Sequence, residues 1–240
     1  MIKNNRINSN YIVHQCSLKN PFTGKFFGNI EVNSSIFVAL PFTTRFLDDV
    51  HADIIHLGAL LADDFSLEVI KFLSGRGKLS VDSQGFLRDV KENNVIAVDW
   101  KEKKKVLKYV YFLKANEYEL RTLTEIDNIV DAANKICEWG VKELIITLGA
   151  SGSVIYNGKE FHVIPAYKVN NAVDATGCGD TFMGGYLYKR LTGEGIDVAA
   201  HFGAAMASLK IQQPGPFSNA ANDINTCLDT YPRVYPNIYM

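Results

Sequence analysis

The chain has 240 residues, with 25 Lys and Arg against 26 Asp and Glu, which gives a net charge of −1 at pH 7. A near-neutral chain argues against nucleic acid as the main partner, because such proteins present a basic face. Hydrophobic residues make up 47% of the chain, enough for the core of one α/β-sized domain. No apolar run is long enough to span a bilayer, so no membrane association is expected.

The cysteines and the N-terminal residues indicate a compartment. The four cysteines are widely spaced and form no Cys-x-x-Cys pair, which is typical of a reduced intracellular protein. The first residues are polar and Asn-rich, with no apolar stretch of the kind found in a signal peptide. We therefore expect the protein in the cytoplasm.

In chain order, apolar runs alternate with amphipathic ones. Residues 24–32 are a candidate strand with poor alternation. Further on, strands are predicted over residues 53–57, 78–82, 109–113 and 143–148, and helices over residues 63–73, 101–108, 123–139, 180–191 and 198–211. Asn157-Gly158 lies between residues 152–156 and 160–164, which predicts a β-hairpin.

Strands that alternate with helices predict an α/β fold, with a mostly parallel central sheet covered by helices on both faces. Ligands of such sheets bind at the carboxyl ends of the strands. Asp82, Asn116 and Gly149 each fall at or just beyond a predicted strand end. We expect them to converge on one crevice, together with the turn described next.

The turn over residues 177–180 is the most informative segment. Gly177, Cys178 and Gly179 precede Asp180 and a small-residue helix. Such a turn presents backbone N–H groups to an anion at a helix N-terminus. A carboxylate there repels an anion, but it makes sense as a base that takes a proton from an attacking hydroxyl. The alternative is a glycine turn that only caps a helix.

Three segments, in order, resemble the signatures of the PfkB (ribokinase-like) carbohydrate kinases. Residues 174–180 resemble the family's Asp-x-x-Gly-Ala-Gly-Asp motif. Asn116 and Glu119 resemble its Asn-x-x-Glu segment. Thr147, Gly149 and Gly152 resemble its Thr-x-Gly-x-x-Gly nucleotide loop. The resemblance covers roughly residues 50–220 and implies a three-layer α/β/α fold.

The resemblance also implies an activity: transfer of a phosphoryl group from ATP to an alcohol of a sugar, polyol or nucleoside. Asp180 would be the base, and the amides of residues 177–179 the anion hole. Asn116 and Glu119 would help to hold Mg²⁺ and phosphate oxygens, Glu119 through water. Asp174 and Thr176 would brace the turn near a monovalent cation such as K⁺, as in some relatives.

The acceptor would lie near Asp82, Gln84 and Arg88, because residues 81–88 resemble a subgroup with suspected inositol or other polyol kinases. Each assignment has an alternative. Asn116 and Glu119 also fit a helix cap with its reciprocal glutamate. Residues 147–152 also fit an ordinary strand-to-strand turn, and Arg88 also fits a surface charge.

The N-terminal region departs from the family pattern. Relatives open with a strand that carries a substrate-binding Asp, followed by a Gly-Gly-x-x-x-Asn-type motif, and neither is found before Asp53. We expect residues 1–35 to be a flap or a remnant of the lid and substrate region, and residues 36–240 to be the ribokinase-like domain. An N-terminal part that is reduced or missing would expose a sheet edge and favour a homodimer. It also supports the alternative of a nucleotide-binding protein without catalysis.

Cys178 stands where the family usually has alanine. A thiol at a helix N-terminus is expected to have a lowered pKa. The sequence therefore predicts a reactive Cys178, whose oxidation or alkylation blocks phosphate binding.

Overall fold

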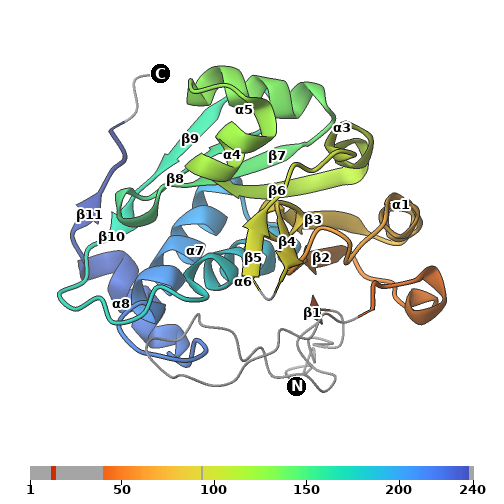
Figure 1. Cartoon of the computed structure of the whole chain (residues 1–240). Helices are drawn as coiled ribbons and strands as arrows, with labels where there is room; N and C mark the ends of the chain where they lie inside the picture. Colours follow the sequence, from red (N-terminus) through yellow and green to blue (C-terminus); the bar gives the residue numbers. More distant parts are fainter. Residues whose placement is uncertain (1–11, 15–39, 93, 238–240) are drawn as a thin grey trace. The chain divides into compact units, whose positions relative to one another are not determined.

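The computed structural model describes residues 12–14, 40–92 and 94–237 (Figure 1). The chain divides into two compact units, Met1–Leu113 and Lys114–Met240. The strand predicted over residues 24–32 lies outside the described residues. So does the proposed flap over residues 1–35, apart from residues 12–14.

The first unit is built on parallel strands. These are β1 (Ile12–His14), β2 (Ile54–Gly58) and β3 (Lys78–Asp82), paired in the order β1-β2-β3. Ile55 and Leu57 of β2 and Leu79 and Val81 of β3 are buried, as expected for strands of a covered parallel sheet. The predicted strands over residues 53–57 and 78–82 are confirmed.

The helix predicted over residues 63–73 starts later than expected. Helix α1 (Leu67–Ser74) begins after Ser66, whose hydroxyl accepts the Val69 N–H at 3.3 Å. The carboxylate of Asp64 instead accepts N–H groups of the preceding loop, at Leu60 and Leu61. The acidic residue thus closes a loop, and the serine is the helix cap.

Residues 83–109 hold short elements that the sequence analysis partly missed. They are α2 (Ser83–Phe86), an antiparallel hairpin of β4 (Arg88–Lys91) and β5 (Asn94–Ala97), α3 (Lys103–Val106) and the 3₁₀ turn η4 (Leu107–Tyr109). The helix predicted over residues 101–108 is therefore split into an α and a 3₁₀ segment. A 3₁₀ helix, η3 (Thr44–Leu47), precedes β2.

The sheet strands of the second unit begin with β6 (Val110–Asn116), which crosses the boundary between the units. The others are β7 (Glu143–Thr147), β8 (Ser153–Tyr156) and β9 (Phe161–Ile164), in the order β6-β7-β8-β9. Strands β8 and β9 pair antiparallel, and the Asn157 side chain accepts the N–H groups of Lys159 and Glu160 in the turn. The predicted hairpin is confirmed.

The long helix predicted over residues 123–139 is wrong, because two helices occupy this part of the chain. Helix α4 (Glu117–Thr124) ends at Glu125, which adopts a left-handed conformation with φ 60°. Helix α5 (Ile129–Glu138) starts after Asn128, whose side chain accepts two backbone N–H groups. A left-handed residue followed by an N-cap interrupts the helix.

The remaining helices are α6 (Cys178–Leu191), α7 (Ile196–Lys210) and α8 (Ala221–Thr230), with a small ribbon of β10 (Ala166–Tyr167) and β11 (Arg233–Val234). In this unit α4 and α5 lie on one side of β7–β9, and α6 and α7 on the other (Figure 1). Glycines let α6 and α7 approach closely: a Cβ on Gly203 would lie 2.6 Å from the Phe182 carbonyl oxygen.

A buried ion pair fastens α6 to β7. The Glu143 carboxylate, only 4% exposed, accepts the Tyr186 hydroxyl at 2.5 Å and the guanidinium of Arg190. Across the described ranges, no helix has the length and apolar character needed to cross a bilayer.

Candidate active site

The turn before α6 has the geometry that its sequence predicts. Gly177 precedes the first helical residue, Cys178, and has φ 76°, a left-handed conformation that favours glycine. Asp180 lies in the first turn of α6 and its side chain is exposed. The helix starts two residues before the predicted residue 180, so the carboxylate stands beside the helix N-terminus.

Backbone N–H groups of this first turn have no carbonyl partner within the helix. The first intrahelical bond runs from the Thr181 N–H to the Gly177 carbonyl, at 2.9 Å. The Cys178 N–H donates to the Ala175 carbonyl at 3.1 Å, inside the turn. Within the 177–179 group of amides, the Cys178 N–H is therefore already engaged inside the turn.

A lysine that the sequence analysis assigned no role lies over this turn. A Cβ built on Gly179 would be 3.2 Å from Nζ and 3.3 Å from Cε of Lys114. Lys114 is on β6 and only 6% exposed. It is two residues before Asn116, so both side chains leave the strand on the same face. This spacing is the signal that could have identified it.

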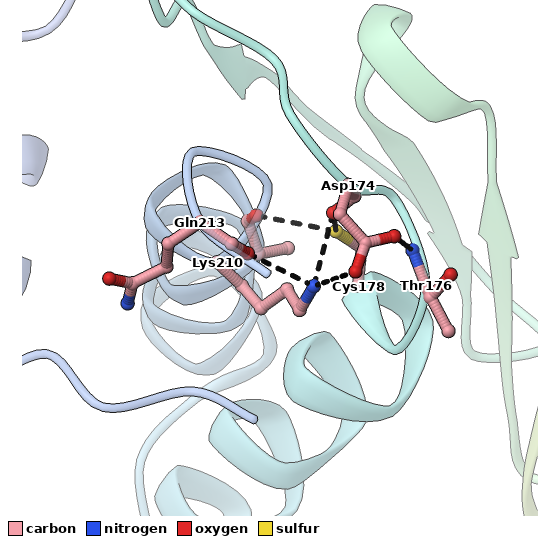
Figure 2. Close-up of polar contacts among 6 residues, drawn as sticks. Asp174, Thr176, Cys178, Lys210 and Gln213 are labelled. Carbon is pink, nitrogen blue, oxygen red and sulfur yellow. Dashed lines mark hydrogen bonds and ion pairs between the residues drawn. The ribbon is translucent and has the colours of Figure 1, made fainter. Parts of the chain in front are cut away.

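Asp174 begins the turn and is held from two directions (Figure 2). One carboxylate oxygen accepts the Thr176 N–H at 2.9 Å. The buried Lys210 Nζ donates to the other carboxylate oxygen at 3.3 Å and to the Asp174 carbonyl at 3.1 Å. The hydrogen bonds from Thr176, and then the Lys210 ammonium, hold the pKa of Asp174 below its usual range.

The expected low pKa of Cys178 is wrong. Burial raises the pKa of this thiol, and the carboxylates of Asp174 and Asp180 raise it further, although the Lys210 ammonium acts in the opposite direction. The sulfur faces the carbonyl oxygens of Asp174 at 3.9 Å and Ala207 at 3.7 Å. A half-buried thiol against carbonyl oxygens keeps its proton.

Asn116 and Glu119 form a complete capping box at the start of α4. The Asn116 side chain accepts the Glu119 N–H at 2.8 Å, and the Glu119 carboxylate accepts the Asn116 N–H and side-chain amide, both at 2.9 Å. Glu119 is only 9% exposed. The geometry is that of a helix cap, as the alternative interpretation predicted. The same hydrogen bonds hold the Glu119 carboxylate at the end of β6.

Thr147, Gly149 and Gly152 connect β7 to β8 through the short 3₁₀ helix η5 (Gly149–Ser151). Gly149 has φ 59° and is exposed, whereas a Cβ on Gly152 would lie 2.2 Å from the Ile164 carbonyl oxygen. Gly152 is thus required by the close approach of a neighbouring strand. The turn does join two antiparallel strands, as the structural alternative proposed.

In the first unit, Asp82, Gln84 and Arg88 are clustered after β3. Asp82 is 6% exposed and accepts the Gln84 N–H at 3.0 Å, which starts α2. Arg88 opens β4 and is half-buried. The hydrogen bond between Asp82 and Gln84 thus forms a polar corner at the carboxyl end of a parallel strand.

A cavity of about 260 Å³ lies beyond the C-terminus of α7, and its lining is mostly polar. The lining residues are Leu209, Gln212, Gln213, Asn219, Asp223, Thr226 and Tyr231. Within the part of the chain that the structure describes, no three His, Cys, Asp or Glu side chains gather to hold a metal ion.

A parallel α/β architecture with a glycine turn at a helix N-terminus is typical of proteins that bind phosphates. The profile described as pfkB family carbohydrate kinase matches residues 49–222. The chain belongs to this family. It has the ribokinase-like three-layer α/β/α fold with a mostly parallel central sheet, as the sequence predicted.

Three known proteins illustrate the similarity. A cytidine kinase of Thermococcus kodakarensis is 28% identical over 183 residues, which are 75% of this chain and 61% of that protein. A pyrophosphate-dependent kinase of the ribokinase family, solved with a pyrophosphate analogue and myo-inositol, is 29% identical with a TM-score of 0.69. The match covers 80% of this chain and 69% of that one.

The third is the ribokinase of Arabidopsis thaliana, solved with ribose and ATP. It is 26% identical with a TM-score of 0.60, and the match covers 75% of this chain and 56% of that one. This chain therefore spans less than two thirds of the length of the cytidine kinase and of the Arabidopsis ribokinase.

Proposed function

We propose that this protein transfers a phosphoryl group from ATP to an alcohol of a sugar, a polyol such as an inositol, or a nucleoside. The observation that carries the proposal is the turn before α6, where a left-handed Gly177 sets a helix N-terminus beside the exposed Asp180. Family membership supports the reaction class.

Each group in the turn has a task. The Asp180 carboxylate takes the proton of the attacking hydroxyl. The amides of residues 177–179 and the helix dipole stabilise the charge on the transferred group. The Lys114 ammonium lies against Gly179 and adds a positive charge at the same place.

The other predicted residues keep their expected roles in the proposal. Thr147, Gly149 and Gly152 take the nucleotide, while Asp82, Gln84 and Arg88 take the acceptor. Both oxygens of Glu119 already accept hydrogen bonds from Asn116, which suits contact with Mg²⁺ through water. Mg²⁺ would neutralise charge on the phosphate oxygens of the donor.

Pyrophosphate is a second candidate donor. The relative solved with a pyrophosphate analogue has the higher TM-score of the two structures compared above. The buried Lys114 at Gly179 would meet the phosphate charge of either donor.

The test is to measure melting temperature with Mg²⁺-ATP and with Mg²⁺-pyrophosphate, followed by phosphate transfer over a panel of sugars, polyols and nucleosides. A ligand that binds only the folded state raises the melting temperature. A rise with one donor and transfer to one acceptor class are expected. A rise without transfer to any acceptor would support the non-catalytic alternative, and no rise with either donor would contradict phosphate binding at the turn.

A further inference from the structure

The turn that holds the proposed catalytic base is fastened to the end of α7. The N–H groups of Val173 and Asp174 both donate to the Ile211 carbonyl, at 2.7 and 3.1 Å. Lys210 adds its ammonium from the last turn of the same helix. Residues 173–176 therefore take their position from the end of α7, and they lead directly into Gly177.

Lys210 is buried to an unusual degree for a lysine. It is only 2% exposed, whereas lysines are almost never fully buried unless their charge is paired. Its partners are the Asp174 carboxylate and carbonyl, and the Gln213 carbonyl at 3.4 Å (Figure 2). Asp174 lies 36 residues before Lys210 and Gln213 lies three residues after it, so two separate segments supply oxygens to one ammonium.

The chemistry of this arrangement matches that of a bound monovalent cation. An ammonium is a compact point charge with three donors, and it has three oxygen acceptors here, one of them ionised. The same oxygens, a carboxylate and two backbone carbonyls, are hard ligands of the kind that bind alkali and alkaline-earth cations. With Nζ among them, K⁺ does not fit beside Asp174.

A helix C-terminus favours a cation, which explains why a lysine stands at the end of α7. It does not explain why the lysine turns inward to a carboxylate at the start of another segment. The cost of burying the charge is offset only if Asp174 stays ionised and in place. The ammonium therefore fixes the conformation of Asp174, and through it the turn over residues 174–180.

We propose that the Lys210 ammonium takes the place of a monovalent cation at the 174–180 turn, so that this protein needs no K⁺ to form its phosphate site. Lys210 is a positioning residue, since it acts on the turn through Asp174. The claim that phosphoryl transfer is independent of K⁺ rests on the proposed function. The claim that Lys210 occupies the cation position rests on the structure alone.

The first test uses the unaltered protein and requires no activity. Melting temperature is measured in chloride salts of K⁺, NH₄⁺, Na⁺ and tetramethylammonium at equal ionic strength. The four values are expected to agree. Binding at about 100 times the dissociation constant would add about 2.7 kcal/mol of stability, an easily resolved shift. A saturable rise that is specific to K⁺ or NH₄⁺ would overturn the proposal.

The second test compares Lys210→Ala with Lys210→Met. Lys210→Ala leaves a space bounded by three oxygens, whereas Lys210→Met fills it with an apolar chain. Both variants are expected to melt below the unaltered protein in tetramethylammonium. K⁺, NH₄⁺ or ethylammonium should raise the melting temperature of Lys210→Ala in a saturable way and leave that of Lys210→Met unchanged. If the melting temperatures of the two variants respond equally to every salt, the proposal that the Lys210 ammonium replaces a cation is overturned.

Lys189→Met is the matched control. Lys189 is on α6, about 16 Å along the helix axis from Cys178 at 1.5 Å per residue, and its ammonium lies over the Phe202 ring. The melting temperature of the Lys189→Met variant should not depend on the cation. If the acceptor is found, turnover of the unaltered protein should also be the same in K⁺ and Na⁺, and a selective activation by K⁺ would contradict the proposal. Absence of any turnover would affect only the proposed function, because the melting tests stand without it.

Discussion

Gly179→Ala separates the role of the phosphate site from the stability of the fold. The new Cβ would lie 3.2 Å from the Lys114 ammonium and 3.3 Å from its Cε. These atoms are the far end of a flexible side chain, which can yield by a few tenths of an ångström. The substitution therefore displaces the ammonium from the turn without forcing the backbone apart.

The expected stability change is small because two effects oppose each other. Ala gains about 0.5–1 kcal/mol over Gly inside a helix. Overpacking costs at least about 1 kcal/mol. A net change within about 1 kcal/mol corresponds to a shift of about 2–4 °C in a chain of this size.

Donor binding should change far more. A hydrogen bond to a charged group contributes about 1.5–3 kcal/mol, and each 1.36 kcal/mol is about a factor of ten, so affinity should fall about 10- to 100-fold. Titration calorimetry with Mg²⁺-ATP and with pyrophosphate measures it. Lys114→Met should produce a loss of similar size, and the double variant should lose little more than either single one, because both act through the same ammonium.

Gly203→Ala is the matched control on the same pair of helices. Its Cβ would lie 2.6 Å from the Phe182 carbonyl oxygen, a backbone atom that cannot swing away. This variant should lose about 1–3 kcal/mol of stability and keep the donor affinity of its folded fraction. Donor affinity of Gly179→Ala within twofold of that of the unaltered protein would contradict this role of Lys114. So would a double variant whose loss of affinity equals the sum of the two single losses.

Three further predictions concern the hydrogen bonds and thiols of the second unit. Tyr186→Phe removes the donor to the buried Glu143 and should cost about 1–3 kcal/mol in urea unfolding, and an unchanged midpoint would contradict this role. Cys178 should react slowly with iodoacetamide at neutral pH because burial raises its pKa, and labelling faster than that of free cysteine would refute this. Burial raises the pKa of Cys227 from 9.0 to about 11, so the folded state keeps a proton that the unfolded chain loses. Stability should fall as pH rises through this interval, and less steeply in Cys227→Ala; equal slopes would be contrary to this linkage.

Local signals in the sequence account for much of the fold. The Asn157-Gly158 turn and the buried runs of β2, β3 and β7 were predicted within one or two residues, because turn chemistry and apolar clustering act over short distances. The split between α4 and α5 was missed, since Glu125 in a left-handed conformation follows no common sequence rule. The N-cap Asn128 was the available signal.

The candidate site was predictable where a motif carries it and not where side chains arrive from elsewhere. Residues 177–180 could be placed at a helix N-terminus from the sequence, because glycine spacing and the following helix determine it. Lys114 lies two residues before Asn116 on β6, and this spacing was the available signal for it. Lys210 reaches the turn from the end of α7, and no local pattern reveals that contact. The low pKa expected for Cys178 was wrong for the same reason, since its burial depends on α7.

The most direct test of the account is phosphoryl transfer by Asp180→Asn beside the unaltered protein. Asn keeps the size of the side chain and removes the base, and the position is exposed, so no core packing is lost. The account predicts donor binding near that of the unaltered protein, with turnover reduced by about 10²–10⁴ or more, as for loss of a general base. Turnover equal to that of the unaltered protein would contradict the assignment of Asp180 and the mechanism built on it.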